Sequence, residues 1–192
     1  MQTVSCIHEG FFENKGSKFF SFLFPFSEFD SLLSQLREKH PKAVHFVYAT
    51  RMKELQVIES FSDDGEPRGS SGVPTLNVLR GEGLVNIGLI TVRYFGGTLL
   101  GVGGLVRAYT QSAQSAILAA KNQNDLIKYE ETLPYKMQIP YSLFSQVLYQ
   151  IEQLRIEILD KCFQAEVIEI SLRSTEEKKN ELHKICSAKF GF

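Results

Sequence analysis

NIGLITVRYFGGTLLGVGGLVRAYTQSAQSAILAAK, residues 86–121, is the stretch that decides the fold of this chain. Its first part, residues 86–95, is apolar and rich in β-branched and aromatic side chains, which predicts a buried strand. Five glycines follow within residues 96–104, and a helix is predicted from Gly103 or Gly104 to about Lys121. That helix carries small apolar residues at helical spacing: Ala113, Ala116, Ile117 and Ala120. The stretch therefore predicts a helix that packs closely against a sheet.

Further strands and helices are predicted on both sides of this stretch. Before it come a helix capped by Ser27, a short helix that opens at Pro74 and ends before Gly81, and strands at residues 3–8, 17–24, 43–50 and 55–61. After it, from residue 135, the order is strand, helix, strand, strand, helix, and Ser174 with Glu177 forms a capping box before the last helix. That order is ferredoxin-like but lacks a clear last strand, so either this sheet has three strands or residues 189–192 form a stub of a fourth. The predicted class is α+β.

A change in composition divides the chain. Thirteen of the 14 glycines lie before Lys121, and the polar stretch of residues 121–125 that follows could serve as a hinge. We therefore predict an N-terminal domain over residues 1–128 and a smaller C-terminal domain over residues 131–192. Neither is a basic module, because there are 13 basic and 13 acidic residues up to Glu130, and 8 and 9 after it. This balance argues against nucleic-acid binding by bulk charge but leaves room for a local cationic site.

Cysteine, histidine and hydropathy patterns exclude other classes. Three cysteines without CxxC spacing do not predict a disulfide framework or a zinc site, and free thiols suit the cytoplasm. The four histidines lack metal-ligand spacing, so we expect no metal and no cofactor. No signal peptide and no membrane span are predicted, because no apolar run approaches the roughly 20 residues that a span requires.

The glycine-rich loop is the first candidate site. Its glycines, between a strand and a helix, allow loop and helix amides to point at one anion, although the spacing matches neither GxxxxGK(S/T) nor the Rossmann motif. Arg107 is predicted in the first turn of the helix, where the helix dipole disfavours a cation, and Arg93 lies at the end of the strand. A bound anion or neighbouring carboxylates would explain both positions. The alternatives are glycines needed only for close packing, or a protein backbone as the ligand. The candidate anion or nucleic-acid site comprises Arg93, Tyr94, Gly96, Gly97, Gly101, Gly103, Gly104, Arg107 and Tyr109.

Three carboxylates within residues 63–66 form the second candidate site. Asp63, Asp64 and Glu66 would repel one another unless cations neutralise them, which is compatible with a Mg²⁺ site or acid–base chemistry. They could instead form an acidic turn, or pair with Arg93 and Arg107 across a cleft. His45, on a predicted strand, is a further candidate, although a satisfied core histidine is the simpler interpretation. No residue is assigned a catalytic role.

These segments, in this order, resemble the IMPACT/YigZ family. The matching residues are His40–His45, Asp63–Pro74 and Arg93–Tyr109, and Ser70-Ser71 stands where the family has Thr-Ala. The resemblance implies an N-terminal domain with the ribosomal-protein-like βαβ fold and a C-terminal domain similar to the ferredoxin-like last domain of elongation factor G. It also implies a link to translation, because eukaryotic relatives regulate the amino-acid-starvation response through protein contacts.

The expected function is therefore a cytoplasmic binding or regulatory protein linked to translation. It would engage RNA or a ribosome-associated partner through the glycine-rich loop, with Asp63, Asp64 and Glu66 at its flank. The alternatives are an enzyme that acts on a phosphorylated or anionic substrate, with Asp64 or Glu66 as base or Mg²⁺ ligand, and a protein-binding adaptor. Whether the chain is an enzyme, and its oligomeric state, stay open at this point.

Overall fold

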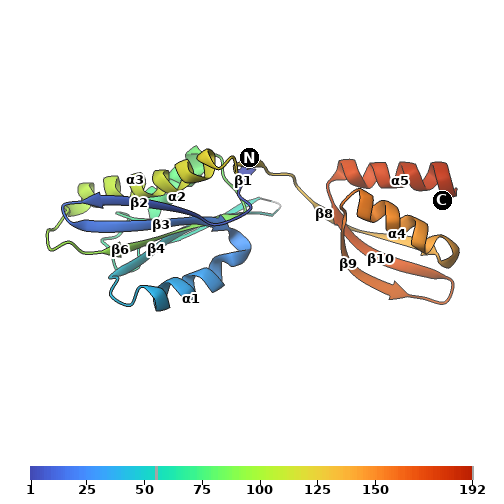
Figure 1. Cartoon of the computed structure of the whole chain (residues 1–192), viewed down its shortest axis with the longest axis horizontal. Helices are drawn as coiled ribbons and strands as arrows, with labels where there is room; N and C mark the ends of the chain where they lie inside the picture. Colours follow the sequence, from blue (N-terminus) through green and yellow to red (C-terminus); the bar gives the residue numbers. More distant parts are fainter. Residues whose placement is uncertain (55, 192) are drawn as a thin grey trace. The chain divides into compact units, whose positions relative to one another are not determined.

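The computed structural model describes residues 1–54 and 56–191. The chain divides into two compact units, Met1–Tyr129 and Glu130–Phe192, each with its own hydrophobic core (Figure 1). Helices and sheets occur in both units, which confirms the α+β class. None of the helices within the described residues combines the length and apolarity needed to cross a membrane.

The first unit is built on an antiparallel five-stranded sheet in the order β2-β3-β6-β4-β5. Its strands are β2 (His8–Asn14), β3 (Ser17–Pro25), β4 (His45–Lys53), β5 (Val57–Ser62) and β6 (Ile87–Tyr94). Helices α2 (Gly72–Gly81) and α3 (Gly101–Asn122) cover one face, and α1 (Phe29–Lys39) covers the other (Figure 1). Since β3 and β4 both pair antiparallel with β6, they run parallel to each other, and β3-α1-β4 is a split β-α-β unit.

Alternation along the central strands explains why both faces are covered. In β3, Leu23 joins the core beneath α2 and α3, whereas Phe22 and Phe24 join the core beneath α1. In β6, Leu89 joins the core beneath α2 and α3, and Ile90 joins the core beneath α1. Successive strand residues point to opposite faces, so a strand that is apolar at nearly every position requires a cover on each side.

A short second sheet joins the start of the first unit to its end. Strand β1 (Gln2–Thr3) pairs antiparallel with β7 (Ile127–Lys128), just after α3. The predicted strand at residues 3–8 is therefore wrong, because β1 ends at Thr3 and β2 begins at His8. The amides of Ser5 and Cys6, which lie between them, donate to the Asp125 carboxylate instead of to a strand.

The second unit has a three-stranded antiparallel sheet in the order β8-β10-β9. Its elements are β8 (Leu133–Pro140), α4 (Phe144–Gln153), β9 (Glu157–Phe163), β10 (Val167–Ser174) and α5 (Glu176–Phe190). This is the predicted strand–helix–strand–strand–helix order. Lys189 and Phe190 belong to α5, so a strand stub over residues 189–192 is wrong for them, and Phe192 lies outside the described residues.

Three predicted helix starts are wrong. Ser27 does not cap α1, because a 3₁₀ turn, η1 (Phe26–Glu28), comes first. Pro74 is the third residue of α2, not the first, and Gly81 lies inside that helix. Ser174 pairs with Leu133 as the last residue of β10, and Thr175 caps α5 by accepting a hydrogen bond from the Lys178 amide at 3.3 Å.

The start of α3 also differs, and this affects the candidate site. The helix begins at Gly101, two residues before the earlier of the predicted starts. Arg107 is therefore its seventh residue and lies beyond the first turn, where the dipole argument would have applied. The predicted strand before the loop ends at Tyr94, one residue earlier than expected.

Candidate functional site

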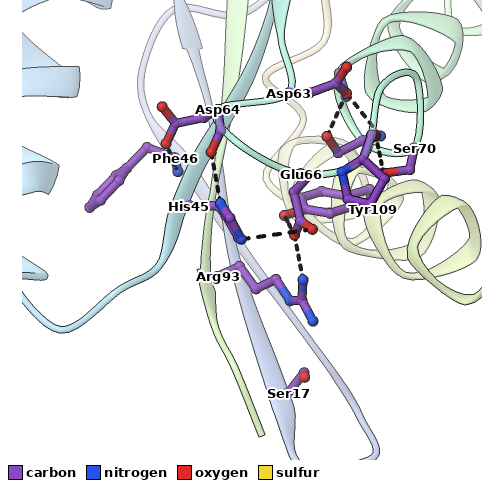
Figure 2. Close-up of polar contacts among 12 residues, drawn as sticks. Ser17, His45, Phe46, Asp63, Asp64, Glu66, Ser70, Arg93 and Tyr109 are labelled. Carbon is purple, nitrogen blue, oxygen red and sulfur yellow. Dashed lines mark hydrogen bonds and ion pairs between the residues drawn. The ribbon is translucent and has the colours of Figure 1, made fainter. Parts of the chain in front are cut away.

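A pocket of about 490 Å³ lies beside the glycine-rich loop. Its walls come from the start of β4, the acidic turn, the end of β6 and the start of α3. Figure 2 shows the polar groups at its floor, where His45, Glu66 and Arg93 converge with Tyr109. The two motifs that the sequence singled out thus meet at one site, although they are about thirty residues apart.

Glu66 is the centre of this polar cluster. Its carboxylate accepts hydrogen bonds from Arg93 Nη1 at 2.5 Å and from the Tyr109 hydroxyl at 2.7 Å, both on Oε1. Glu66 is 8% exposed and Arg93 is 5% exposed, so the ion pair is almost fully removed from water. Burial, together with the adjacent Glu66 charge, raises the pKa of Tyr109 far above its usual range. Tyr109 is therefore a hydrogen-bond donor at any physiological pH.

Arg93 retains donors that Glu66 does not use. Its Nε is buried and has no hydrogen-bond partner among the described residues. Its guanidinium lies over the rings of Phe19 and Phe95, at 5.5 and 5.8 Å from their centroids. An arginine offers five N–H donors, so one ion pair leaves capacity for a further acceptor in the pocket.

His45 is held in one tautomer by the acidic turn. Its Nδ1 lies 2.7 Å from the Asp64 carbonyl oxygen, and a carbonyl only accepts, so Nδ1 carries a proton. Its Nε2 faces Glu66 Oε2 at 3.8 Å (Figure 2). Asp64 adopts a φ of 43° and its carboxylate accepts the Phe46 amide at 2.6 Å, which fixes the turn against β4.

Asp63 has a structural role at the start of α2. Its carboxylate accepts hydrogen bonds from the amides of Gly69, Ser71 and Gly72 and from the Ser71 hydroxyl. Burial acts to raise the pKa of Asp63, but these hydrogen bonds outweigh it and hold the pKa below its ordinary value. The helix lacks a cap from its own N-cap side chain, Ser71, and Asp63 supplies one from nine residues before Gly72.

The three carboxylates therefore separate into different roles. Within the described residues, they do not form a group able to share one metal ion. Glu66 pairs with Arg93, as one of the interpretations had it. Arg107 is exposed and makes no ion pair with any described residue. Asp64 lies 3.7 Å from Arg37, a partner that sequence reasoning did not consider.

The glycines serve different purposes along the loop. A Cβ on Gly96 would lie 2.0 Å from the Gly16 carbonyl carbon, so this glycine permits two backbones to touch. Gly97 and Gly101 adopt φ values of 83° and 69°, which favour glycine, and face open space. Close packing thus accounts for Gly96. The amides that begin α3 have no side-chain cap at the N-cap residue, Leu100.

Two aromatic residues of the predicted site do not present a ring to the pocket. Tyr94 is adjacent to Arg93 on β6 and joins the α1 face, where its hydroxyl lies 2.9 Å from His40 Nδ1. Tyr109 is a fully buried residue of α3, so its ring has no free face for a base. Neither residue is placed to stack on a nucleotide in the pocket.

Sequence reasoning missed the apolar mouth of the pocket. Large side chains there stand exposed, with Leu99 at 83%, Val102 at 58%, Val44 at 52% and Phe95 at 48%. The signal was present in the sequence, because leucine and valine among loop glycines have no helical or strand pattern to bury them. Exposed apolar side chains gathered in one place are typical of an interaction site.

Comparison with known proteins identifies relatives of this chain. The model of the Impact N-terminal domain matches residues 15–117. An IMPACT family member from Haemophilus influenzae (strain ATCC 51907 / DSM 11121 / KW20 / Rd) is 38% identical, over 78% of this chain and 73% of that protein. IMPACT family member YigZ from Escherichia coli (strain K12) is 33% identical, over 72% of this chain and 67% of that protein.

A solved structure described as that of a hypothetical protein extends the likeness to both units. It superposes with a TM-score of 0.77 at 27% identity, over 99% of this chain and 93% of that one. The matched residues 15–117 include the whole Arg93–Tyr109 motif and the acidic turn, so both walls of the pocket lie inside the family domain. The chain belongs to the IMPACT family.

Proposed function

We propose that this chain is a cytoplasmic binding protein linked to translation, which captures an apolar segment of a ribosome-associated protein in the pocket beside its glycine-rich loop. The link to translation rests on family resemblance. The mode of binding rests on one observation, the ring of exposed Val44, Phe95, Leu99 and Val102 around a pocket with a polar floor. An apolar mouth with a few buried polar groups suits a ligand that inserts an apolar group and ends in a hydrogen-bond acceptor.

RNA is supported less well as the direct ligand. Phosphate contacts require free cations, and Arg93 is already paired with Glu66. Arg107, exposed on α3, is the remaining arginine of the motif. Of the three rings beside the loop considered for base stacking, Tyr109 is buried and Tyr94 faces α1, which leaves only the exposed ring of Phe95.

Sedimentation with purified ribosomes tests this proposal. The wild-type chain is expected to pellet with ribosomes, and Leu99→Asp to remain in the supernatant, because a carboxylate at the mouth opposes apolar contact. Leu118→Asp is the control, since Leu118 is an exposed leucine on α3, the helix that follows the loop, and does not line the pocket. Equal sedimentation of Leu99→Asp and wild type would contradict the proposed site.

Salt dependence separates protein from RNA as the ribosomal ligand. Binding through several phosphates weakens by orders of magnitude between about 50 and 200 mM salt. Contact through an apolar mouth is expected to change far less. A steep loss for the wild type, with weaker binding and a shallower salt dependence in Arg107→Ala, would favour RNA instead.

An enzyme acting on an anionic substrate is the second candidate. It is favoured by the floor of the pocket, where His45 is oriented by Asp64 and faces Glu66, and where Arg93 Nε has no partner. Such an enzyme would be stabilised thermally by its substrate. This second proposal is tested by screening small carboxylates and phosphates for compounds that raise the melting temperature. The rise should be absent in His45→Gln.

A further inference from the structure

A second cluster of reactive side chains lies away from the pocket, in the first unit. Cys6 Sγ, His8 Nε2 and a carboxylate oxygen of Asp125 all lie within 4.8 Å of one another. Two come from the bend and strand at the start of the chain, and the third follows the end of α3. We propose that these three residues form a binding site for a zinc-class divalent ion.

Two of the three distances between the donor atoms fit a tetrahedral ion. With bonds of about 2.3 Å to sulfur and about 2.05 Å to nitrogen or oxygen, a tetrahedral ion separates sulfur from either by about 3.5 Å. Cys6 Sγ lies 3.5 Å from His8 Nε2 and 3.5 Å from Asp125 Oδ2. His8 Nε2 and Asp125 Oδ2 are 2.6 Å apart, because they share a hydrogen bond. Replacing that proton by an ion requires this pair to open by about 0.7 Å.

The charge around the cluster favours a cation. Asp125 Oδ2 lies 3.5 Å from Cys6 Sγ and 2.6 Å from His8 Nε2, so its carboxylate is shared by both other residues of the cluster. That carboxylate attracts a divalent ion, which displaces the thiol proton on binding.

The backbone holds the ligands together before any ion arrives. Pairing of Gln2 with Lys128 and of Thr3 with Ile127 fixes the start of the chain beside the end of the first unit. Ser5 orients the Asp125 carboxylate through its amide at 2.9 Å and through its hydroxyl. Such outer partners of a ligating carboxylate are what a metal site requires.

Sulfur, imidazole and carboxylate together select a borderline ion such as zinc over magnesium or calcium. Three protein ligands leave a fourth position, and because Cys6 is exposed that position is open to water. His8 Nδ1 is buried without a hydrogen-bond partner among the described residues. Metal-bound histidines usually donate from this atom, and losing such a partner costs about 10–100-fold in affinity. We therefore expect weaker binding than at a structural zinc finger.

Cobalt titration of the reduced, metal-free, full-length protein tests the site. One equivalent of Co²⁺ should produce a thiolate-to-cobalt charge-transfer absorption, and Zn²⁺ should displace it. Cys6→Ser should lose the absorption, whereas the matched variant Cys162→Ser should keep it, since Cys162 is the other exposed thiol and lies in the second unit. Asp125→Asn should weaken zinc binding at least tenfold.

Thermal unfolding supplies an independent measurement. Zn²⁺ should raise the melting temperature of the wild type, by mass action on the folded state, and leave Cys6→Ser unchanged. If folded wild-type protein shows neither the cobalt absorption nor a zinc-dependent rise in melting temperature, the proposed site is overturned. Cys6, His8 and Asp125 would then serve only as a hydrogen-bonded contact. An absorption that persists in Cys6→Ser would place the metal elsewhere and overturn it equally. Both variants are checked for native circular dichroism.

Discussion

At the scale of single residues, Glu66 and Arg93 form an ion pair that is almost fully buried. Removing one partner of such a pair leaves an uncompensated charge, which costs about 3–5 kcal/mol. We predict a loss of this order for Glu66→Gln in the free energy of unfolding, measured by urea denaturation. Tyr109→Phe, which removes only a hydrogen-bond donor to Glu66, should cost less.

The double variant Glu66→Gln/Arg93→Met tests whether the loss of stability comes from the interaction of the two charges or from packing alone. With both charges removed, neither is left unpaired, so the double variant should recover part of the loss seen in Glu66→Gln. Additive losses in the two single variants and the double variant would show that the charges do not interact.

Asp63 gives the protein a defined response to acid. Its folded pKa is lowered, so its contribution is present above the unfolded pKa near 3.8 and is lost as pH falls through the still lower folded value. Asp63→Asn should weaken the cap of α2 by about 1–2 kcal/mol at neutral pH. It should also flatten the decline of stability between about pH 5 and pH 2, which urea melts across this range would measure. An unchanged slope would assign the acid response to other carboxylates.

At the scale of elements, the loop between β6 and α3 and the first turn of α3 each contain a glycine, and we expect opposite effects when the two are replaced by alanine. Gly96→Ala places a Cβ 2.0 Å from the Gly16 carbonyl carbon and 2.2 Å from the Ser17 amide nitrogen, and both are backbone atoms. We predict destabilisation at the upper end of the roughly 1–3 kcal/mol typical of overpacking.

Gly103→Ala is the matched control for this prediction. Gly103 lies inside α3, and its nearest atom would be Arg107 Nη1 at 3.8 Å from the new Cβ. Alanine is better than glycine in a helix by roughly 0.5–1 kcal/mol, so Gly103→Ala should stabilise the protein. If the denaturation midpoints of the two variants shifted in the same direction relative to wild type, this account of the loop would be refuted.

The two units also share one local device at the same point in their topology. Pro25-Phe26-Ser27-Glu28-Phe29 and Pro140-Tyr141-Ser142-Leu143-Phe144 each end a strand, form a 3₁₀ turn and open a helix. In both units that helix leads to a strand parallel to the first, with an antiparallel strand between them. Proline sets the extended backbone at the strand end, and the turn redirects the chain across the sheet.

At the scale of the whole molecule, the two units have separate cores, which predicts separate folding. A fragment of residues 1–129 keeps the five-stranded sheet, its three helices and the pairing of β1 with β7. It should unfold cooperatively, with the thermal midpoint of one transition of the full chain, as followed by circular dichroism. A fragment of residues 1–122, which lacks Asp125 and β7, should melt at a lower temperature. A fragment 1–129 without a cooperative transition would show that the first unit depends on the second.

Local pattern by itself determined the class, the order of most elements and the motifs that mark the family. It did so because apolar periodicity, glycine spacing and charge balance are properties of neighbouring residues. Some errors were avoidable on the same grounds: Arg93 and Tyr94 are adjacent in a strand, so they could not share a face. Helix starts were misplaced because the groups that satisfy the first amides, such as Asp63 for α2, lie outside the window of a capping motif.

Only the tertiary structure decided which charges meet. The sequence left open whether Glu66 binds a metal, closes a turn or pairs with an arginine, and the packing of the acidic turn against β6 and α3 brings it to Arg93 and Tyr109. It likewise brings Asp125 to Cys6 and His8, more than a hundred residues away along the chain. No spacing rule reaches so far, because distant residues become neighbours only when strands pair and helices cover them, and that depends on burial summed over the whole unit.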